Sequence, residues 1–294
     1  MENVSDGAPR TAVFLGLLGP PVLARPDGTV ALARRKSMAL LAYLALEPSL
    51  QLRDGLASLL WPECGQAGAR ANLRQCLFDL GRAAGKDLVT VRQDAIGLDE
   101  GAVEVDVDRF RRLSARCPRH GPDSACPECA GRLESAARLW RGDFMAGFTI
   151  ADSSDYDHWQ LSWAERLGDA YRETLSRLVA HNRYDGRLAE AEEYASLWIR
   201  AEPYDEDARR SRIGLLLLSG RPARAVECYR EWERTSREEL GQDPEPATTA
   251  LVAPLLAKPA GAGMELALAP RRAAPTSARA PSSARSSAAA RSPA

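Results

Sequence analysis

Between residues 69 and 82, apolar side chains recur every three or four positions, which predicts a helix with one buried face. The opposite face carries polar and basic side chains of the kind that match base edges and phosphates. This stretch is therefore a candidate for nucleic-acid contact, although an ordinary solvated surface helix would show the same pattern. The inward positions are Ala69, Leu73, Cys76, Leu77 and Leu80, and the outward positions are Ala71, Arg74, Gln75, Phe78 and Arg82.

The residues before this helix predict a small sheet and two further helices. Residues 11–32 contain β-type segments around a Pro-Asp-Gly turn at 26–28, which indicates antiparallel strands. The apolar run 38–46 predicts a buried helix that ends at Glu47-Pro48. A second helix is expected over 53–60, closed by Trp61-Pro62 and followed by a loop over 62–68. Its inward residues are expected to be Leu52, Leu56, Leu59 and Leu60.

Short alternating segments follow the third helix, with a turn at Gln93-Asp94, and they predict a β-hairpin over about 87–107. A further helix is expected from Asp106 to Leu113. The order of small sheet, three helices and hairpin is that of a winged helix, in which the third helix enters the major groove. A generic α+β domain is the alternative at this point.

The second half of the chain reads as almost entirely helical. A long amphipathic helix is expected over 155–182, and a closing helix over 245–256. Two units between them repeat with a period of 34 residues, which is the tetratricopeptide spacing. Three pairs carry this period: Gly186 and Gly220 are expected at the turns, and two pairs of small residues are expected where helices cross, Ala189 with Ala223 and Ala191 with Ala225.

The segment that joins the two halves contains four soft metal ligands in a stretch of 13 residues. Their spacing is Cys-x2-His-x5-Cys-x2-Cys, at Cys117, His120, Cys126 and Cys129. Thiolates and imidazole at such spacing suit a tetrahedral structural zinc, which would order a Pro-rich stretch with no other obvious means of folding. The alternative is four reduced residues in a flexible linker. No other cofactor is expected.

Charge separates the two halves. The 294 residues carry a formal net charge of −1, yet residues 34–92 hold nine Arg or Lys against five Asp or Glu. Residues 131–250 hold 17 against 23. The basic residues are almost all Arg, which suits phosphate and guanine recognition but also follows from a GC-rich genome. Because no apolar run approaches the roughly 18 residues of a membrane span and the start lacks a signal layout, we expect a cytoplasmic protein with reduced cysteines.

The pattern therefore predicts a mainly α protein, with an N-terminal α+β winged helix before an all-α, tetratricopeptide-like domain. The final 38 residues are rich in Ala, Ser, Pro and Arg, which predicts a disordered tail. The expected parts are a polar tail over 1–10, the winged helix over 11–110, the Cys/His connector over 111–130, the helical domain over 131–256 and the tail over 257–294.

Several segments in this order resemble the Streptomyces antibiotic regulatory protein family, whose members join a response-regulator-type winged helix to a bacterial transcriptional activator domain. The resemblance spans roughly residues 11–256. It rests on RRKSMALLAYLAL, LASLLWPE, ARANLRQCLFDLGR, DAIGLD with VEVDVDRF, ARLWRGDFMAGF and SGRPARAVECYREWERTSREELGQDPEP. In that family the third helix sits in the major groove, and the loop before it can face the transcription machinery.

The resemblance implies three groups of DNA contacts. They are Arg70, Arg74, Gln75 and Arg82 on the third helix, Arg92 on the hairpin, and Arg34, Arg35 and Lys36 at a helix start. Gly81 departs from the family, which usually has Arg there, and is expected to weaken the end of the helix. Phe78 could pack on a thymine methyl group, but we expect it to be partly buried.

The sequence thus predicts a sequence-specific DNA-binding transcription regulator, an activator that recruits RNA polymerase. Its expected partners are double-stranded promoter DNA, RNA polymerase and a second copy of itself, with no membrane. The alternative is a tetratricopeptide-type scaffold whose winged helix no longer reads specific DNA. No phosphate loop, nucleophile elbow or His-Glu-x2-His motif is present, so no enzyme is expected.

Overall fold

The first sheet joins two segments that are distant in sequence. In the computed structural model, which describes residues 13–99, 101–119 and 126–257, its strand order is β3-β2-β1-β7. β1 pairs with β2 in antiparallel register, Phe14 opposite Ala24, and with β7 in parallel register, Val13 opposite Val103. The strands are β1 (Val13–Gly16), β2 (Val22–Arg25), β3 (Gly28–Thr29) and β7 (Val103–Val105). The antiparallel part is as predicted, but assigning 103–105 to the hairpin was wrong, since local alternation does not reveal a partner some 90 residues away.

Three helices follow the first three strands, and the predicted second helix has the predicted bounds. They are α1 (Arg35–Leu46), α2 (Arg53–Leu60) and α3 (Gln66–Ala84). α3 begins inside the predicted 62–68 loop and continues beyond Gly81. It ends at Gly85, which has φ 109° and donates its N–H to the carbonyl of Gly81. A left-handed backbone of this kind favours glycine, so the helix stops there.

A second sheet forms the wing beside α3. Its order is β4-β6-β5, with strands β4 (Gln51–Leu52), β5 (Val89–Arg92) and β6 (Ala95–Leu98), and a short 3-10 turn η1 (Lys86–Leu88) leads into it. β5 and β6 pair around the predicted turn, where Gln93 has φ 53°. β4 was not predicted. Because Leu52 lies on this strand it is 67% exposed, and its predicted inward position was wrong.

Two helices flank the Cys-containing connector. They are α4 (Asp106–Ser114) and α5 (Pro127–Leu139), with Pro127 in the first turn, where its missing N–H costs nothing. The predicted connector 111–130 is therefore too wide at both ends, since α4 extends to Ser114 and α5 begins at Pro127. Proline, which suggested irregular structure here, instead starts a helix. His120 and residues 121–125 lie outside the described residues.

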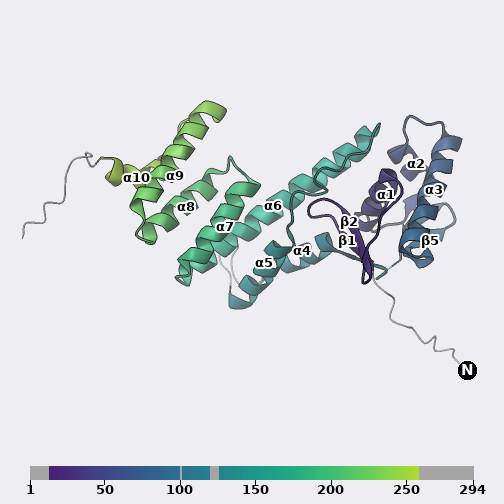
Figure 1. Cartoon of the computed structure of the whole chain (residues 1–294), viewed down its shortest axis with the longest axis horizontal. Coiled ribbons are helices and arrows are strands. Elements are labelled where there is room, and N and C mark those ends of the chain that lie inside the picture. Colours follow the sequence, from purple (N-terminus) through teal and green to yellow (C-terminus); the bar gives the residue numbers. More distant parts are fainter. Residues whose placement is uncertain (1–12, 100, 120–125, 258–294) are drawn as a thin grey trace, which may run out of the picture. The chain divides into compact units, whose positions relative to one another are not determined.

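The remaining helices form a row in which each packs against the next (Figure 1). They are α6 (Ser154–Tyr184), α7 (Leu188–Ala201), α8 (Glu206–Leu218), α9 (Pro222–Thr235), a π-helical turn η2 (Ser236–Leu240) and α10 (Pro246–Leu256). Gly186 and Gly220 both have positive φ, 74° and 69°, at the turns before α7 and α9. Of the small-residue pairs, Ala191 and Ala225 are fully buried at crossings, whereas Ala189 and Ala223 are exposed.

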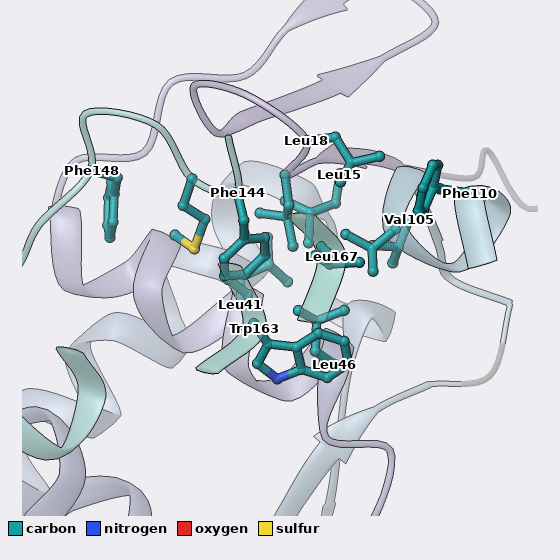
Figure 2. Packing of buried hydrophobic residues seen from close by; sticks show 14 of the residues in the cluster. Leu15, Leu18, Leu41, Leu46, Val105, Phe110, Phe144, Phe148, Trp163 and Leu167 are labelled. Atoms are coloured by element: carbon teal, nitrogen blue, oxygen red, sulfur yellow. The ribbon is translucent and has the colours of Figure 1, made fainter. Parts of the chain in front are cut away.

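One hydrophobic core runs from the first sheet into the helical row. It brings together Leu15 of β1, Leu41 of α1, Phe110 of α4 and Trp163 of α6 (Figure 2). The end of α1 is fastened to α6, because the Glu47 carboxylate accepts hydrogen bonds from the indoles of Trp159 and Trp163, at 2.9 and 3.3 Å. A smaller cluster around Ile213, Tyr229 and Val252 lies between α8, α9 and α10. Among the described residues, none of the helices combines the length and apolar character required to cross a bilayer.

Candidate nucleic-acid interface

The outward face of α3 is the candidate interface. Ala69, Leu73, Cys76 and Leu80 are buried on its inner side, as predicted, where α3 packs on α1 and α2. The outer side is exposed. Helical geometry puts Ala71, Phe78 and Arg82 along its middle, with Arg74 and Gln75 on either flank.

Phe78 is 63% exposed, so the expectation of partial burial was wrong. The helix does not rotate it inward because the buried stripe is already filled by smaller side chains at helical spacing. Phe78 borders a shallow groove between α3 and the wing, whose other lining residues are Leu77, Gly81, Arg82, Lys86, Val89 and Val91. An aromatic ring and basic side chains thus share one surface.

The arginines of α3 differ in whether they have a partner. Arg70, on the border nearer α2, forms a two-pronged ion pair with Asp54: both its Nε and its Nη2 lie 2.6 Å from the carboxylate. The hydrogen bond from Arg70 lowers the pKa of the Asp54 carboxyl. Arg74 and Arg82 are exposed and, over the described ranges, form no hydrogen bond or ion pair. Arg92 on β5 is also exposed and free of such contacts there.

Gln75 lies on the opposite border and is positioned by Asp79. Its side-chain amide donates to Asp79 Oδ1 at 3.2 Å, and Arg34 pairs with the other oxygen of the same carboxylate. One acidic residue thus holds both a candidate reading residue and a candidate backbone contact.

The other basic residues at the start of α1 turn toward the protein. Arg35 donates through Nε to the carbonyl of Thr149 at 2.9 Å and lies over the Phe148 ring. Lys36 is 3.5 Å from Glu63 and lies over the Trp61 ring. Positive charge is disfavoured at a helix N-terminus, so these partners offset a local cost. The structure brings Arg34, Arg35 and Lys36 together, and they line one pocket with Gln75 at the border of α3.

Packing does not require a glycine at position 81. A Cβ built there would meet only the Lys86 backbone, at 3.9 Å, which is ordinary van der Waals contact. The helix continues for three residues beyond this position, so the expected weakening does not end it.

Asp106, the first residue of α4, ties this helix to the backbone that follows β1 and to Arg141 after α5, and no pattern in the sequence singled it out. Its buried carboxylate accepts N–H bonds from Leu17, at 2.8 and 2.9 Å, and Leu18, at 3.0 Å, and lies 3.5 Å from Arg141. Burial raises the pKa of this carboxyl, while these donors oppose the shift. In the sequence, an acidic residue at this position indicates only the start of a helix. It does not show which distant residues the side chain will contact.

The three described cysteines of the predicted metal set lie together. The Sγ atoms of Cys117, Cys126 and Cys129 are all within 4.8 Å of one another. His120, the fourth predicted ligand, lies outside the described residues.

A family model, that of the bacterial transcriptional activator domain, matches residues 105–256. The chain belongs to this family. The match begins at the junction of β7 and α4, well before residue 131, where the helical domain was expected to start. The same family domain was named in the resemblance, which is confirmed.

Curated relatives extend the match over the N-terminal region as well. The regulatory protein AfsR of Streptomyces coelicolor is 29% identical over 88% of this chain and 26% of its own length. The transcriptional regulatory protein EmbR of Mycobacterium tuberculosis is 26% identical over 80% of this chain and 61% of its own. MoaR1 of the same species, also a transcriptional regulatory protein, is 25% identical, over 85% and 81%. The chain thus spans about a quarter of AfsR and three fifths of EmbR.

A solved structure has the same fold. It is Mycobacterium tuberculosis EmbR in complex with a low-affinity phosphopeptide, with a TM-score of 0.63 and 23% identity over 83% of this chain and 65% of that one. The predicted fold class, a winged helix followed by a helical domain, is confirmed.

Proposed function

We propose that this protein is a sequence-specific DNA-binding regulator of transcription, of the activator type, and that it acts in the cytoplasm. The observation that carries the proposal is the exposed outer face of α3, which presents Arg74, Gln75, Phe78 and Arg82 beside the β5–β6 wing. The regulatory names of its relatives support the same class of function.

In the proposed complex, α3 lies in the major groove and its flanks read base edges. Arg74 is placed to donate to a guanine, and Gln75, whose amide nitrogen is held by Asp79, retains its carbonyl oxygen as an acceptor. Arg82 and Arg92 would contact phosphates on either side of the groove. Phosphate contacts set the register and make affinity salt-dependent, whereas the base contacts give specificity.

The helical row is proposed to contact RNA polymerase and a second copy of the chain. Its support is a hollow between α7 and the turn before α9, lined by both acidic and basic side chains, including Glu192, Glu193, Arg200 and Arg221. Mixed charge of this kind suits a protein partner rather than DNA. A pure scaffold function, the alternative, would leave the exposed basic face of α3 without a role.

The test begins by selecting sites from random duplex DNA with the full chain, followed by affinity measurements on the selected site. The double variant Arg74→Ala/Gln75→Ala should lose about 30 to 2 × 10⁴-fold in specific affinity, from about 1–3 kcal/mol for each base contact. Binding to unrelated DNA should fall much less.

Arg230→Ala provides the matched control, because Arg230 is an exposed arginine on α9, far along the chain from α3. It should bind the selected site like the wild type. If no sequence is enriched, or if the double variant binds the selected site with unchanged affinity, the proposed reading mechanism is wrong and the scaffold alternative gains.

A further inference from the structure

Three cysteine side chains converge from two separate parts of the backbone, between the last helix of the wing-bearing region and the first helix after it. Cys117 follows α4, whereas Cys126 caps the start of α5 and Cys129 lies in its first turn. The Sγ atoms of all three lie within 4.8 Å of one another, and those of Cys126 and Cys129 are 3.3 Å apart. Cys129 is buried, and the other two are half-buried.

These separations are close to those of a thiolate-bound zinc ion. With Zn–S bonds of about 2.3 Å and tetrahedral angles, neighbouring sulfurs are about 3.8 Å apart. The Cys126–Cys129 separation is 3.3 Å and the other two are at most 4.8 Å, so shifts of about 1 Å or less would complete the geometry. We propose that Cys117, Cys126 and Cys129 bind a structural Zn²⁺ ion.

The surroundings suit thiolates. Cys126 and Cys129 sit at the N-terminus of α5, where the backbone N–H groups and the helix dipole favour negative charge. The guanidinium of Arg132 lies 3.5 Å from Cys129 Sγ and donates to the Ala115 carbonyl at 3.4 Å. Arg132 therefore partly balances the charge of the thiolates and fixes the backbone just before Cys117, as groups behind metal ligands commonly do.

The position of the site, between α4 and α5, indicates what a bound metal would stabilise. Cys117 is three residues beyond the end of α4, and α4 starts with Asp106, which binds the backbone of residues 17 and 18. The other two ligands start α5. A metal here would hold α4 against α5 and so stiffen the connection between the DNA-reading region and the helical row. Surface pairs such as Arg119–Glu128, at 3.1 Å with both side chains over 70% exposed, add little on their own.

Metal analysis of the full chain, purified without chelators, tests the proposal directly. We expect about one equivalent of zinc, and replacement by Co²⁺ should give the near-ultraviolet absorption typical of cobalt–thiolate bonds. Cys117→Ser and Cys126→Ser should each bind Co²⁺ at least tenfold more weakly. Cys64→Ser and Cys228→Ser remove half-buried thiols outside the cluster and should leave zinc content and the cobalt spectrum unchanged.

A second measurement guards against variants that fail to fold. Treating the wild type with a chelator should lower its Tm and speed protease cleavage between α4 and α5, and added Zn²⁺ should reverse both effects. Purified protein without metal that also fails to bind added Zn²⁺ or Co²⁺, or a Cys126–Cys129 disulfide that persists after mild reduction, would overturn the proposal. So would cobalt–thiolate absorption that survives loss of Cys117 and Cys126.

Discussion

The start of α1 and the outer face of α3 carry similar basic side chains, yet the structure uses them differently. Arg34, Arg35 and Lys36 each have a partner within the protein, and two of them also lie over aromatic rings. Arg74 and Arg82 are exposed and, among the described residues, form no ion pair. Both groups were predicted to contact DNA, and only the second is available without breaking contacts first.

The difference shows that a local excess of basic residues does not by itself define a binding surface. Each arginine that is already paired must exchange one partner for another on binding DNA, so its net gain is smaller. Asp54 and Asp79 decide which arginines remain available, and each belongs to a different element from the arginine that it pairs with.

The largest expected effect separates the two groups directly. Arg74→Ala should weaken binding to a selected DNA site about 5 to 150-fold, from about 1–3 kcal/mol for a base contact. Arg35→Ala should leave that affinity within about twofold, but should lower the free energy of unfolding by about 1–2 kcal/mol through loss of its contacts with Thr149 and Phe148. Fluorescence anisotropy and denaturant titration give the two values. Equal losses of DNA affinity would remove the distinction.

The next effect concerns the buried Asp106 carboxylate, which binds the backbone of residues 17 and 18. Asp106→Asn puts an amide group among the N–H donors of Leu17 and Leu18 and should destabilise the protein by about 1–3 kcal/mol. Burial raises the pKa of the Asp106 carboxyl in the folded protein. The contribution of this group to the free energy of unfolding is therefore full below the pKa of about 4 that it has in the unfolded chain, and it declines as pH rises through the pKa of the folded state. The stability gap between wild type and variant, measured by denaturant titration across pH, should therefore narrow as pH rises. A gap that widens with pH would contradict this assignment.

The smallest effect converts a paired arginine into an available one. Asp54→Ala frees Arg70, which should raise affinity for unrelated DNA a few-fold and steepen the dependence of log affinity on log salt by about 0.9. Asp27→Ala, in the exposed turn between β2 and β3, removes the same charge without freeing an arginine. It should change the salt slope less. Identical slopes for both variants would show that Arg70 does not reach the phosphates.

Local pattern predicted much of the fold and of the α3 face. The spacing of Ala69, Leu73, Cys76 and Leu80 identified the buried side of α3, and the 34-residue period placed the turns at Gly186 and Gly220. It failed for Leu52, which was placed inward but is exposed, and the expected partial burial of Phe78 went against a spacing that had placed it outward. Hydrophobicity alone does not say whether a partner element covers a residue.

The sequence by itself determined the order of the elements, the helical period and the family, because these depend on short-range spacing and on several motifs in a fixed order. Only the tertiary structure decided that β7 joins β1, that Asp106 holds the backbone of residues 17 and 18, and that Asp54 and Asp79 engage Arg70 and Arg34. Each of these contacts joins residues between 16 and about 90 positions apart. Such contacts depend on how packed elements bring distant residues together, which no local pattern records.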